Sequence, residues 1–381
     1  MRALISSTQG SGHFGPMMPV IEGLVRRGDE VLIVVPPALS SRVQALDLPL
    51  RVAADPPERE VAAIWDRIRT SSRREASALI NGELFGRLDT AAMLPTLEDV
   101  MNEWRPDVAI HEPAEFGAAI AAERRGIRHV QVAIGLAGVE ASSLELAASV
   151  LESFESGIVE QIRASAYLSR LPASLDPSTY RSTSRYREVA DVAAEPLPDW
   201  WSGDESPLVY ISFGTVVGSL PYAQAAYRAA IDAVSELPLR ALLTLGGTRE
   251  VVDVGELPTN VHVERWVAQE HALRLASVVL CHGGAGTTFG ALATGTPLVI
   301  MPMMADQSAN ADLASSAGAA VVVRPRPDNA GTPIGPVDVP RIRDAIMAVL
   351  TDGAYARAAQ DVADEMRTTP SLDQVLDGVF G

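Results

Sequence analysis

One stretch of the chain, residues 278–288, constrains the fold more than any other. It is an unbroken apolar run that ends at His282 and continues into the glycine-rich segment 283–286 and two threonines. The apolar run predicts a buried strand, the glycines allow a tight turn without Cβ clashes, and a helix can begin at Thr287 or Thr288. The N-terminus of such a helix exposes unpaired N–H groups and about half a positive charge, which favours a phosphate or diphosphate. Turns of this kind also occur in α/β proteins that bind no phosphate.

The N-terminal half begins with the same kind of unit. Residues 2–6 predict a short buried strand, residues 10–16 a second glycine turn, and the apolar spacing over 17–25 a helix. The next strand, 30–35, stops at two prolines, and a strand–helix–strand crossover forces the two strands to be parallel. The pattern then recurs with a strand at 107–110, a helix at 114–125 and a strand at 129–133.

The length of the chain and a stretch without periodicity near its middle indicate two domains. A chain of 381 residues exceeds one ordinary core and fits two domains of about 190 residues each. Proline, glycine and acidic residues without periodicity over 194–207 predict an exposed linker. We therefore expect an N-terminal domain over 1–193, this linker, and a C-terminal domain over 208–381. Strands are expected in the second half at 208–213, 241–245, 261–264, 278–281, 298–301 and 319–323, and helices at 222–236, 339–350, 354–366 and 372–379.

Charge, cysteine content and hydropathy exclude several classes of protein. The 31 basic and 48 acidic residues give a net charge of −17, which argues against a nucleic-acid or anionic-membrane partner. The single cysteine, Cys281, rules out an internal disulfide and disfavours a thiolate metal site. The first residues have too short an apolar stretch for a signal peptide, and no window reaches the roughly 18 apolar residues of a membrane span. We expect a cytoplasmic protein.

The first glycine turn matches a dinucleotide-binding pattern. Gly10, Gly12 and Gly15 form G-x-G-x-x-G between a strand and a helix, which makes a dinucleotide-dependent oxidoreductase an alternative. That pattern needs an acidic side chain about 20 residues further on, at the end of the second strand. Here the strand ends in valines and prolines over 34–37, so the carboxylate is missing and this interpretation is weakened.

The same turn contains a histidine that suits proton transfer. Imidazole titrates near neutral pH, so His13 is a candidate general base for an incoming hydroxyl. A general base usually has an orienting carboxylate, and Glu112, directly after the strand 107–110, can lie at the same carboxyl edge of the sheet. The sequence pattern is equally compatible with a structural role for both residues. In that case His13 only completes the turn, and Glu112 only begins a helix or carries a solvated charge.

The sequence does not support metal catalysis. It contains no D-x-D, and its six histidines, at 13, 111, 129, 262, 271 and 282, have no ligand spacing such as H-E-x-x-H. We therefore expect no metal and no bound cofactor. The charge of a diphosphate leaving group would instead be stabilised by N–H groups of the segment 284–287, the side chain of His282 and Thr215.

Taken together, these motifs resemble the nucleotide-sugar-dependent glycosyltransferases of GT-B fold. In particular, the chain resembles the bacterial enzymes that attach sugars to natural products such as polyketides, macrolides and enediynes. The motifs that carry the resemblance, in order, are residues 10–13 with Pro16, then 265–269, 282–288 and 302–311. The resemblance covers nearly the whole chain. It implies an α/β protein of two Rossmann-like domains whose parallel sheets face a central cleft, with C-terminal helices closing the chain.

The resemblance also implies roles for particular residues. His13 stands where the family carries its catalytic histidine. Trp266 and Val267 would receive the nucleobase, although a tryptophan at this place can also be a core anchor. Asp306 and Gln307 would hold hydroxyls of the donor sugar. The predicted donor-binding residues are Thr215, Trp266, Val267, Gln269, His282, Gly283, Gly284, Ala285, Gly286, Thr287, Asp306 and Gln307.

Two positions depart from the family pattern. In many relatives that use uridine diphosphate sugars, a glutamate eight residues after the motif histidine binds the ribose hydroxyls, and here that position is Gly290. A buried carboxylate facing a deoxyribose would lack one partner, so its absence favours a dTDP-sugar over a UDP-sugar. Many relatives have an aspartate where this chain has Glu112, and the extra methylene puts the geometry of the His13–Glu112 dyad in doubt.

We therefore predict an inverting glycosyltransferase. His13 would deprotonate the acceptor hydroxyl, Glu112 would stabilise the imidazolium, and attack on the anomeric carbon would expel the nucleoside diphosphate. The expected substrates are a dTDP-sugar carrying a deoxy sugar and a small-molecule aglycone such as a polyketide, macrolide or enediyne. The aglycone-binding residues are unassigned, within the irregular segments 55–104 and 135–186, and a homodimer is allowed. A nucleotide-sugar epimerase of GT-B fold and a non-catalytic nucleotide- or glycan-binding protein are also compatible with these motifs.

Overall fold

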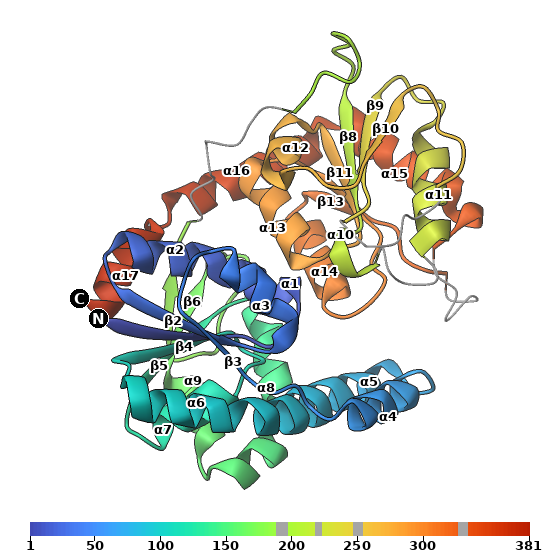
Figure 1. The fold of residues 1–381 in the computed structure, drawn as a ribbon. Coiled ribbons are helices and arrows are strands. Elements are labelled where there is room, and N and C mark those ends of the chain that lie inside the picture. Colours follow the sequence, from blue (N-terminus) through green and yellow to red (C-terminus); the bar gives the residue numbers. More distant parts are fainter. Residues whose placement is uncertain (188–196, 218–222, 247–253, 327–333) are drawn as a thin grey trace. The chain divides into compact units, whose positions relative to one another are not determined.

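The chain forms two compact α/β units (Figure 1). The computed structural model describes residues 1–187, 197–217, 223–246, 254–326 and 334–381. Unit 1 comprises Met1–Val189 and Thr369–Gly381, and unit 2 comprises Ala190–Thr368. Each unit is built on its own parallel sheet with helices packed against it, which confirms the expected α/β class with two Rossmann-like domains.

The sheet of unit 1 has seven parallel strands in the order β3-β2-β1-β4-β5-β6-β7. They are β1 Arg2–Ser6, β2 Glu30–Val35, β3 Leu50–Val52, β4 Val108–His111, β5 Arg128–Val132, β6 Ala166–Ser169 and β7 Ser182–Arg185. The apolar patterns predicted β1, β2, β4 and β5, whose residues are nearly all buried. They did not predict β3, β6 and β7, because the first and last of these are short edge strands with few buried residues.

The sheet of unit 2 has six parallel strands in the order β10-β9-β8-β11-β12-β13. They are β8 Leu208–Ser212, β9 Arg240–Thr244, β10 Val261–Glu264, β11 Val278–Cys281, β12 Leu298–Ile300 and β13 Ala320–Val322. Every one of them was predicted to within a few residues. Strands β8, β9, β11 and β12 are almost wholly buried apolar runs, whereas β10 and β13 have one buried residue each.

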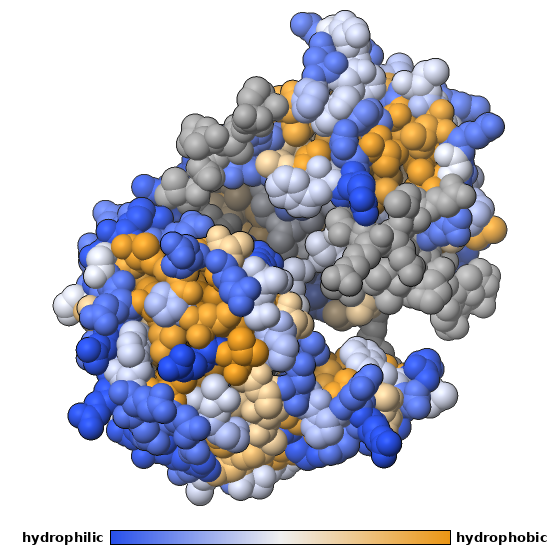
Figure 2. Space-filling view, in the orientation of Figure 1, coloured by the Kyte–Doolittle hydropathy of each residue, from blue (hydrophilic) through white to orange (hydrophobic). Residues whose placement is uncertain are grey.

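Helices cover both sheets. Those of unit 1 are α1 Ser11–Phe14, η1 Gly15–Met17, α2 Met18–Arg26, α3 Pro37–Gln44, α4 Glu58–Ile68, α5 Arg73–Ala78, the π-helix η2 Leu79–Asp89, α6 Thr90–Trp104, α7 Gly117–Glu123, α8 Ala137–Phe154, α9 Ile158–Ala164 and α17 Leu372–Phe380. Those of unit 2 are α10 Gly214–Val217, α11 Ala223–Val234, α12 Gln269–Leu275, α13 Ala285–Thr294, α14 Gln307–Ser316, η4 Pro336–Asp338, α15 Val339–Thr351 and α16 Gly353–Thr368. Hydrophilic residues cover much of the visible surface of each unit, and apolar patches remain between them (Figure 2).

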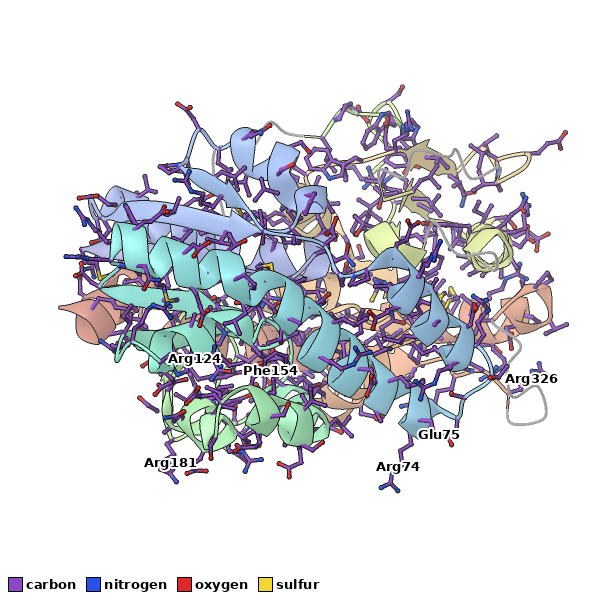
Figure 3. All side chains as sticks on the ribbon, turned by 60° about the horizontal axis from the view of Figure 1, so that its bottom comes forward. Arg74, Glu75, Arg124, Phe154, Arg181 and Arg326 are labelled. Carbon is purple, nitrogen blue, oxygen red and sulfur yellow. The ribbon has the colours of Figure 1, made fainter. Side chains whose placement is uncertain are left out.

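The segment 55–104 forms a helical arm on unit 1. Helices α4 and α5 project from the sheet, and Arg74 and Glu75 lie near the far end of the arm (Figure 3). Ser72 and Glu75 form a capping box that begins α5. The π-helix η2 then returns along the arm, and Ile64 packs with Leu79 in a small apolar cluster of its own. The arm therefore ends beside the sheet, where α6 begins.

The strand order reverses once in each sheet. In unit 1 the chain adds β2 and β3 on one side of β1 and then β4 on the other, and in unit 2 it adds β9 and β10 on one side of β8 and then β11 on the other. The connections that follow the two central strands therefore run to opposite sides of the sheet. Ligands bind at such topological switch points in open parallel sheets.

The last helix corrects the expected domain boundary. The prediction placed all of 208–381 in the second domain, but α17 packs on α2 of unit 1. Leu376 is fully buried in the core of that unit, and a Cβ on Gly23 would lie 2.7 Å from its Cδ1, so the two helices approach closely. Arg26 and Asp373 form an ion pair at 2.9 Å across the same contact. The first residues of the expected linker, 194–196, lie outside the described residues.

We predict that Leu376→Ala destabilises unit 1. A buried leucine cut to alanine costs about 2–5 kcal/mol through lost burial and the cavity that remains. Hydrogen exchange measured by mass spectrometry should show faster exchange in β1, β2 and α2, with unit 2 unchanged. Asp377→Asn, on an exposed side chain of the same helix, is the control and should leave both units unchanged. Faster exchange confined to unit 2 would contradict this assignment of α17.

Candidate functional site

The first candidate site lies at the switch point of unit 1. Thr8 follows β1, Glu112 directly follows β4, and these strands are neighbours in the sheet. Gly10 has φ of 115°, a value that only glycine adopts readily, and this turn allows α1 to begin at once. The amide of His13 donates to the carbonyl of Gly10 at 3.2 Å in that first helical turn. The fold therefore brings together the two residues that the sequence predicted as a catalytic pair.

Glu112 is held by four contacts in a fully buried position. Its Oε1 accepts hydrogen bonds from the amide of Thr8 at 3.1 Å and from the hydroxyl of Thr8 at 2.7 Å. Its Oε2 accepts from the amide of Ala114 at 2.7 Å, and His13 Nδ1 lies 3.1 Å from Oε1. The extra methylene of glutamate is thus accommodated, and the carboxylate reaches the imidazole.

The contacts of Thr8 define which nitrogen of His13 carries a proton. The Thr8 hydroxyl gives its single proton to Glu112, so toward His13 Nδ1, 3.1 Å away, its oxygen can only accept. The ring proton therefore lies on Nδ1, and Nε2 keeps its lone pair in the neutral ring. The side chain of His13 is 23 % exposed. An Nε2 lone pair on a partly exposed ring is the form that a general base requires.

The dyad is electrostatically stabilised as an ion pair. Burial by itself would raise the pKa of Glu112, but the charge and hydrogen bond of His13 and the donors around the carboxylate hold it at about 2. Burial would likewise lower the pKa of His13, but the neighbouring Glu112 outweighs it and raises that pKa above the ordinary value. Glu112 is therefore ionised at neutral pH, and it stabilises the imidazolium that forms when His13 takes a proton.

The π-helix η2 adds two residues that sequence reasoning missed. The ring of Phe85 packs against His13 with 5.3 Å between centroids. Asp89 is buried, and burial followed by the charge of Glu112 raises its pKa to about 7. Its Oδ2 has no hydrogen-bond partner within the described part of the chain. Neither residue stands in a recognisable motif, because a π-helix places side chains at a spacing that α-helical periodicity does not reveal.

The second candidate site is the turn that follows β11 in unit 2. Gly283 has φ of +88°, and a Cβ there would lie 2.8 Å from the carbonyl oxygen of Gln307. A Cβ on Gly284 would lie 2.4 Å from the ring of His282. Both positions therefore need glycine, and the helix α13 begins directly afterwards at Ala285, two residues before the predicted start at Thr287.

The imidazole of His282 is buried between two glycine backbones. It packs against Gly284 and also against Gly214, where a Cβ would lie 2.9 Å from the ring. Burial lowers the pKa of His282 to about 4 against a smaller opposing effect of the Ser212 backbone, so the ring is neutral. Its Nδ1 finds no hydrogen-bond partner among the described residues. A neutral imidazole carries one N–H and can donate one hydrogen bond.

The N-terminus of α13 has the chemistry of an anion site. Among the residues that the structure describes, no side chain caps this ten-residue helix. The Thr287 hydroxyl donates to Gln269 Oε1 at 3.0 Å, which joins the start of α12 to this turn. The remaining predicted residues of the turn, Ala285 and Gly286, supply backbone amides of the first helical turn. Such amides and the helix dipole favour a phosphate.

Trp266 is a surface residue and not a core anchor. Its side chain is 69 % exposed, more than any other large apolar side chain among the described residues, whereas Val267 is partly buried. An exposed indole in the loop before α12 offers a flat apolar face for stacking. Thr215, at the start of α10, is also exposed and follows β8, the strand next to β11. Thr215 therefore lies at the switch point of unit 2, whereas Trp266 and Val267 follow β10, the edge strand two places from β8.

Asp306 and Gln307 are tied to the glycine turn through a residue that was not predicted. Asn310 Nδ2 donates to Asp306 Oδ2 and to the carbonyl of Gly283, each at 2.9 Å. Gln307 Oε1 accepts hydrogen bonds from the amides of Met303 and Met304, at 2.8 and 2.9 Å. This oxygen therefore stabilises the loop that precedes α14. Only the Gln307 amide nitrogen is left for a ligand. The signal for Asn310 was its position four residues after Asp306, on the same face of a helix.

Gly290 lies on the face of α13 that packs against α12. A Cβ at this position would lie 2.9 Å from Leu273 Cδ1. A larger side chain in its place would require a shift of the Leu273 side chain.

Within the described ranges, no group of three or more histidine, cysteine, aspartate or glutamate side chains is arranged to hold a metal ion. In the same ranges, no helix has the length and hydropathy needed to cross a membrane.

The fold is that of GT-B glycosyltransferases. The spinosyn rhamnosyltransferase SpnG, solved with thymidine diphosphate, matches with a TM-score of 0.82 and 21 % identity over the whole of both chains. The glycosyltransferase SnogD from Streptomyces nogalater matches with a TM-score of 0.76 and 22 % identity, covering 100 % of this chain and 98 % of that one. At this identity the likeness establishes the fold.

Sequence comparison then defines the family. The model of the N-terminal domain of erythromycin biosynthesis protein CIII-like proteins matches residues 24–214, and that of their C-terminal domain matches residues 228–379. The chain therefore belongs to the erythromycin biosynthesis protein CIII-like family of glycosyltransferases. Oleandomycin glycosyltransferase of Streptomyces antibioticus is 26 % identical over 94 % of this chain and 86 % of its own length. Elloramycin glycosyltransferase ElmGT of Streptomyces olivaceus is 27 % identical over 97 % of this chain and 94 % of its own length. The chain is thus an enzyme of a family that glycosylates antibiotics.

We predict that the contribution of Glu112 to stability depends on pH. Its pKa in the folded state is about 2, below the ordinary 4.5, so its ionisation stabilises the fold above pH 4.5 and this stabilisation is lost as the pH falls toward 2. The raised pKa of His13 adds stability below pH 6.5 that is lost as the pH rises through its folded value. Urea unfolding should therefore show a larger difference between wild type and Glu112→Gln at pH 6 than at pH 3. An equal difference at both pH values would contradict the ionised dyad.

Proposed function

We propose that this glycosyltransferase transfers a sugar, with inversion, from a dTDP-sugar to a hydroxyl group of a natural-product aglycone. The observation that carries the proposal is the contact of His13 with the buried, ionised Glu112 and with Thr8, which leaves the second ring nitrogen as a base. The names of relatives support the substrate class, since they include the 10-deoxymethynolide desosaminyltransferase of Streptomyces venezuelae and the oleandomycin enzyme. The solved spinosyn enzyme SpnG contains thymidine diphosphate in one structure and the spinosyn aglycone in another.

Unit 2 would bind the donor. The amides at the start of α13 and the neutral imidazole of His282 would donate hydrogen bonds to the diphosphate, and the exposed Trp266 would stack on the base. Asp306 would accept from the sugar hydroxyls while Asn310 keeps its carboxylate in place. Position 290 is a glycine and carries no carboxylate that would bind a ribose 2′-hydroxyl, and this favours a deoxyribose donor.

Unit 1 would supply the base. His13 Nε2 would take the proton of the acceptor hydroxyl as its oxygen attacks the anomeric carbon, and the bond from that carbon to the diphosphate oxygen would break. The imidazolium that results is stabilised by Glu112 3.1 Å away. The electron pair leaves with the diphosphate, whose charge the helix N-terminus of unit 2 would stabilise. Neither step assigns a role to a metal ion.

An oxidoreductase and an epimerase are less well supported. The end of β2, at Val35, carries no acidic residue that could hold the ribose of a dinucleotide, and the switch point of unit 1 holds the His13–Glu112 dyad instead. This disfavours the oxidoreductase. A GT-B epimerase would use the same donor without an acceptor. Product analysis after incubation with dTDP-sugar alone separates an epimerase, which forms a new nucleotide sugar, from a transferase.

We predict that His13→Ala abolishes most transfer but preserves donor binding. Loss of a general base typically lowers the rate by about 10²–10⁴-fold. Transfer should be measured from a dTDP-sugar to a panel of polyketide and macrolide aglycones. Binding of thymidine diphosphate should be measured by calorimetry, and the dissociation constant of His13→Ala should equal that of the wild type. Turnover by His13→Ala at the wild-type rate would remove His13 from its assigned role.

We further predict that thymidine diphosphate binds more tightly than uridine diphosphate. A ligand at 100 times its dissociation constant stabilises the folded state by about 2.7 kcal/mol, which is a visible shift in thermal unfolding. Gly284→Ala should weaken both nucleotides, because its Cβ would overlap the His282 ring. Gly12→Ala, at a position with open space in the turn of unit 1, is the matched control. A rise in the unfolding temperature with NAD, and none with either nucleoside diphosphate, would favour the oxidoreductase over the glycosyltransferase.

A further inference from the structure

The described part of the predicted linker, residues 197–207, folds onto unit 2. It carries two adjacent tryptophans, Trp200 and Trp201, which are partly buried, whereas most other residues of the segment are exposed. The amide of Asp204 donates to the carbonyl of Trp201 at 3.1 Å, and the amide of Ser206 donates to Asp204 Oδ1 at 2.8 Å. These hydrogen bonds close a compact turn. We call residues 198–206 the strap.

The strap lies on the edge strand β10. The ring of Trp200 stacks on the imidazole of His262, with 4.4 Å between centroids and 20° between planes. Trp201 packs edge-on against the same imidazole at 6.0 Å and 77°. Arg240, the first residue of β9, places its guanidinium 5.6 Å from the centre of the Trp201 ring and donates to the carbonyl of Ser206 at 2.9 Å. Stacking, edge-on and cation–π contacts are each stabilising, so they join the strap to both β9 and β10.

The strap contacts the face of β10 that points away from the core. Successive side chains of a strand point to opposite faces, and Val261 and Val263 pack with the core of unit 2. His262 and Glu264 therefore lie on the other face. His262 Nε2 lies 2.9 Å from Glu264 Oε1, and this contact orients the ring on which Trp200 stacks. Because β10 is an edge strand that pairs with β9, a covering segment stabilises it.

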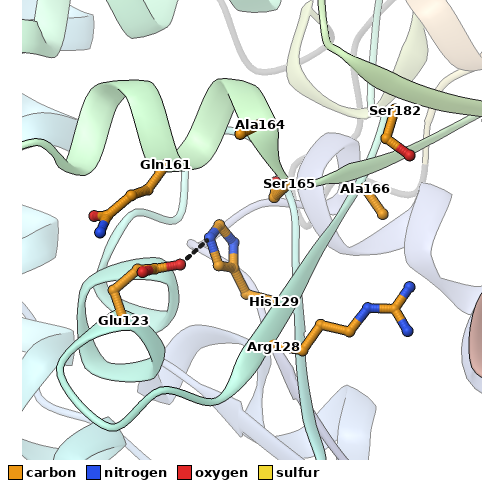
Figure 4. A pocket seen from close by; sticks show the side chains of 8 residues that line it. All are labelled: Glu123, Arg128, His129, Gln161, Ala164, Ser165, Ala166 and Ser182. Atoms are coloured by element: carbon orange, nitrogen blue, oxygen red, sulfur yellow. Dashed lines mark ion pairs between the residues drawn. The ribbon is translucent and has the colours of Figure 1, made fainter.

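A second His–Glu pair, in unit 1, lacks such a cover. His129 on β5 places Nε2 3.2 Å from Glu123 Oε1 and Nδ1 3.1 Å from His111 Nε2. The pair of His129 and Glu123 lines an open pocket of about 410 Å³ (Figure 4), and the described residues around this pocket include no tryptophan. The aromatic cover is therefore a feature of β10 and not of every strand that carries a His–Glu pair.

The loop after β10, residues 265–268, contains Trp266 and leads into α12. Its downstream end is held because the Thr287 hydroxyl donates to Gln269 Oε1 at 3.0 Å. Its upstream end is held by β10, where the carbonyl of Glu264 accepts from the amide of Leu245 at 3.1 Å. The exposed Trp266 thus depends at one end on an edge strand of four residues, and the strap holds this strand from outside.

We propose that Trp200 is a positioning residue for donor binding. By holding β10 through His262, it keeps the loop 265–268 in the conformation in which Trp266 receives the base of the nucleoside diphosphate. The inference rests on the proposed stacking of the base on Trp266. A loop that is already ordered loses less conformational freedom when the ligand binds, so this preorganisation increases affinity. Loss of Trp200 therefore weakens donor binding and leaves the chemical step intact.

Calorimetry with thymidine diphosphate tests this inference. Trp200→Ala should weaken binding by about threefold to tenfold. Trp200→Phe keeps a ring over His262 and should bind as the wild type does. Adding Trp200→Ala to Trp266→Ala should weaken binding no further than Trp266→Ala alone, because the first residue acts through the second. In transfer assays, Trp200→Ala should raise the KM for the donor and leave kcat and its pH profile unchanged.

Hydrogen exchange without nucleotide locates the effect. Trp200→Ala and His262→Gln remove the same stacking from its two sides, and both should speed exchange in β10 and in residues 265–268. Trp65→Ala is the matched control, because it removes an indole that is 42 % exposed on α4 of unit 1, and it should change neither exchange in β10 nor nucleotide binding. His129→Gln, at the pocket of Figure 4, is the control for His262→Gln, and any faster exchange that it causes should be confined to unit 1.

Three outcomes would overturn the inference. The first is wild-type affinity and exchange in Trp200→Ala, and the second is additive losses of affinity in the double variant. The third is wild-type affinity in Trp266→Ala, in which case the proposed stacking of the base fails as well. If Trp266→Ala weakens binding and Trp200→Ala does not, the proposed stacking stands and only the positioning role of Trp200 fails.

Discussion

The reversal of strand order in each parallel sheet is the constraint on which both candidate sites depend. Parallel strands need crossovers that return the chain to the same edge, so their carboxyl ends gather on one side, and only where the order reverses do adjacent loops diverge. In unit 1 this places Thr8 beside Glu112, and in unit 2 it places Gly214 beside His282. Each sheet is therefore a rigid support for one chemical site at a predictable place.

The two sites follow the same kind of strand-end turn but differ in the charge that they bury. Unit 1 buries a negative charge, which is stable only because two backbone amides, a hydroxyl and an imidazole satisfy the Glu112 carboxylate. Unit 2 buries a neutral imidazole and leaves helix amides without a capping side chain in the described part, so it is prepared for an anion that the protein itself does not supply. A base and an anion site are complementary requirements of sugar transfer.

Close packing explains why glycine occurs where the sequence pattern shows it. At Gly283 and Gly284 a Cβ would overlap Gln307 or His282, and at Gly23 it would overlap Leu376. The first two let the turn pack closely against Gln307 and His282, whereas the third joins α17 to α2. Sequence alone does not distinguish these cases, because glycine in a helix is as compatible with a weak helix as with a close contact.

The sequence by itself determined the two α/β halves, ten of the thirteen strands and the turns that carry His13 and His282, because buried parallel strands and glycine turns are local signals. It also predicted Glu112 as the partner of His13. Only the tertiary structure decided that α17 belongs to unit 1, that Asp89 and Phe85 of the π-helix lie near the dyad, and that Trp266 is exposed. It likewise brought together His111 and His129, which are 18 residues apart and have no ligand spacing. These are contacts between distant segments, and they depend on strand pairing and packing that no local pattern encodes.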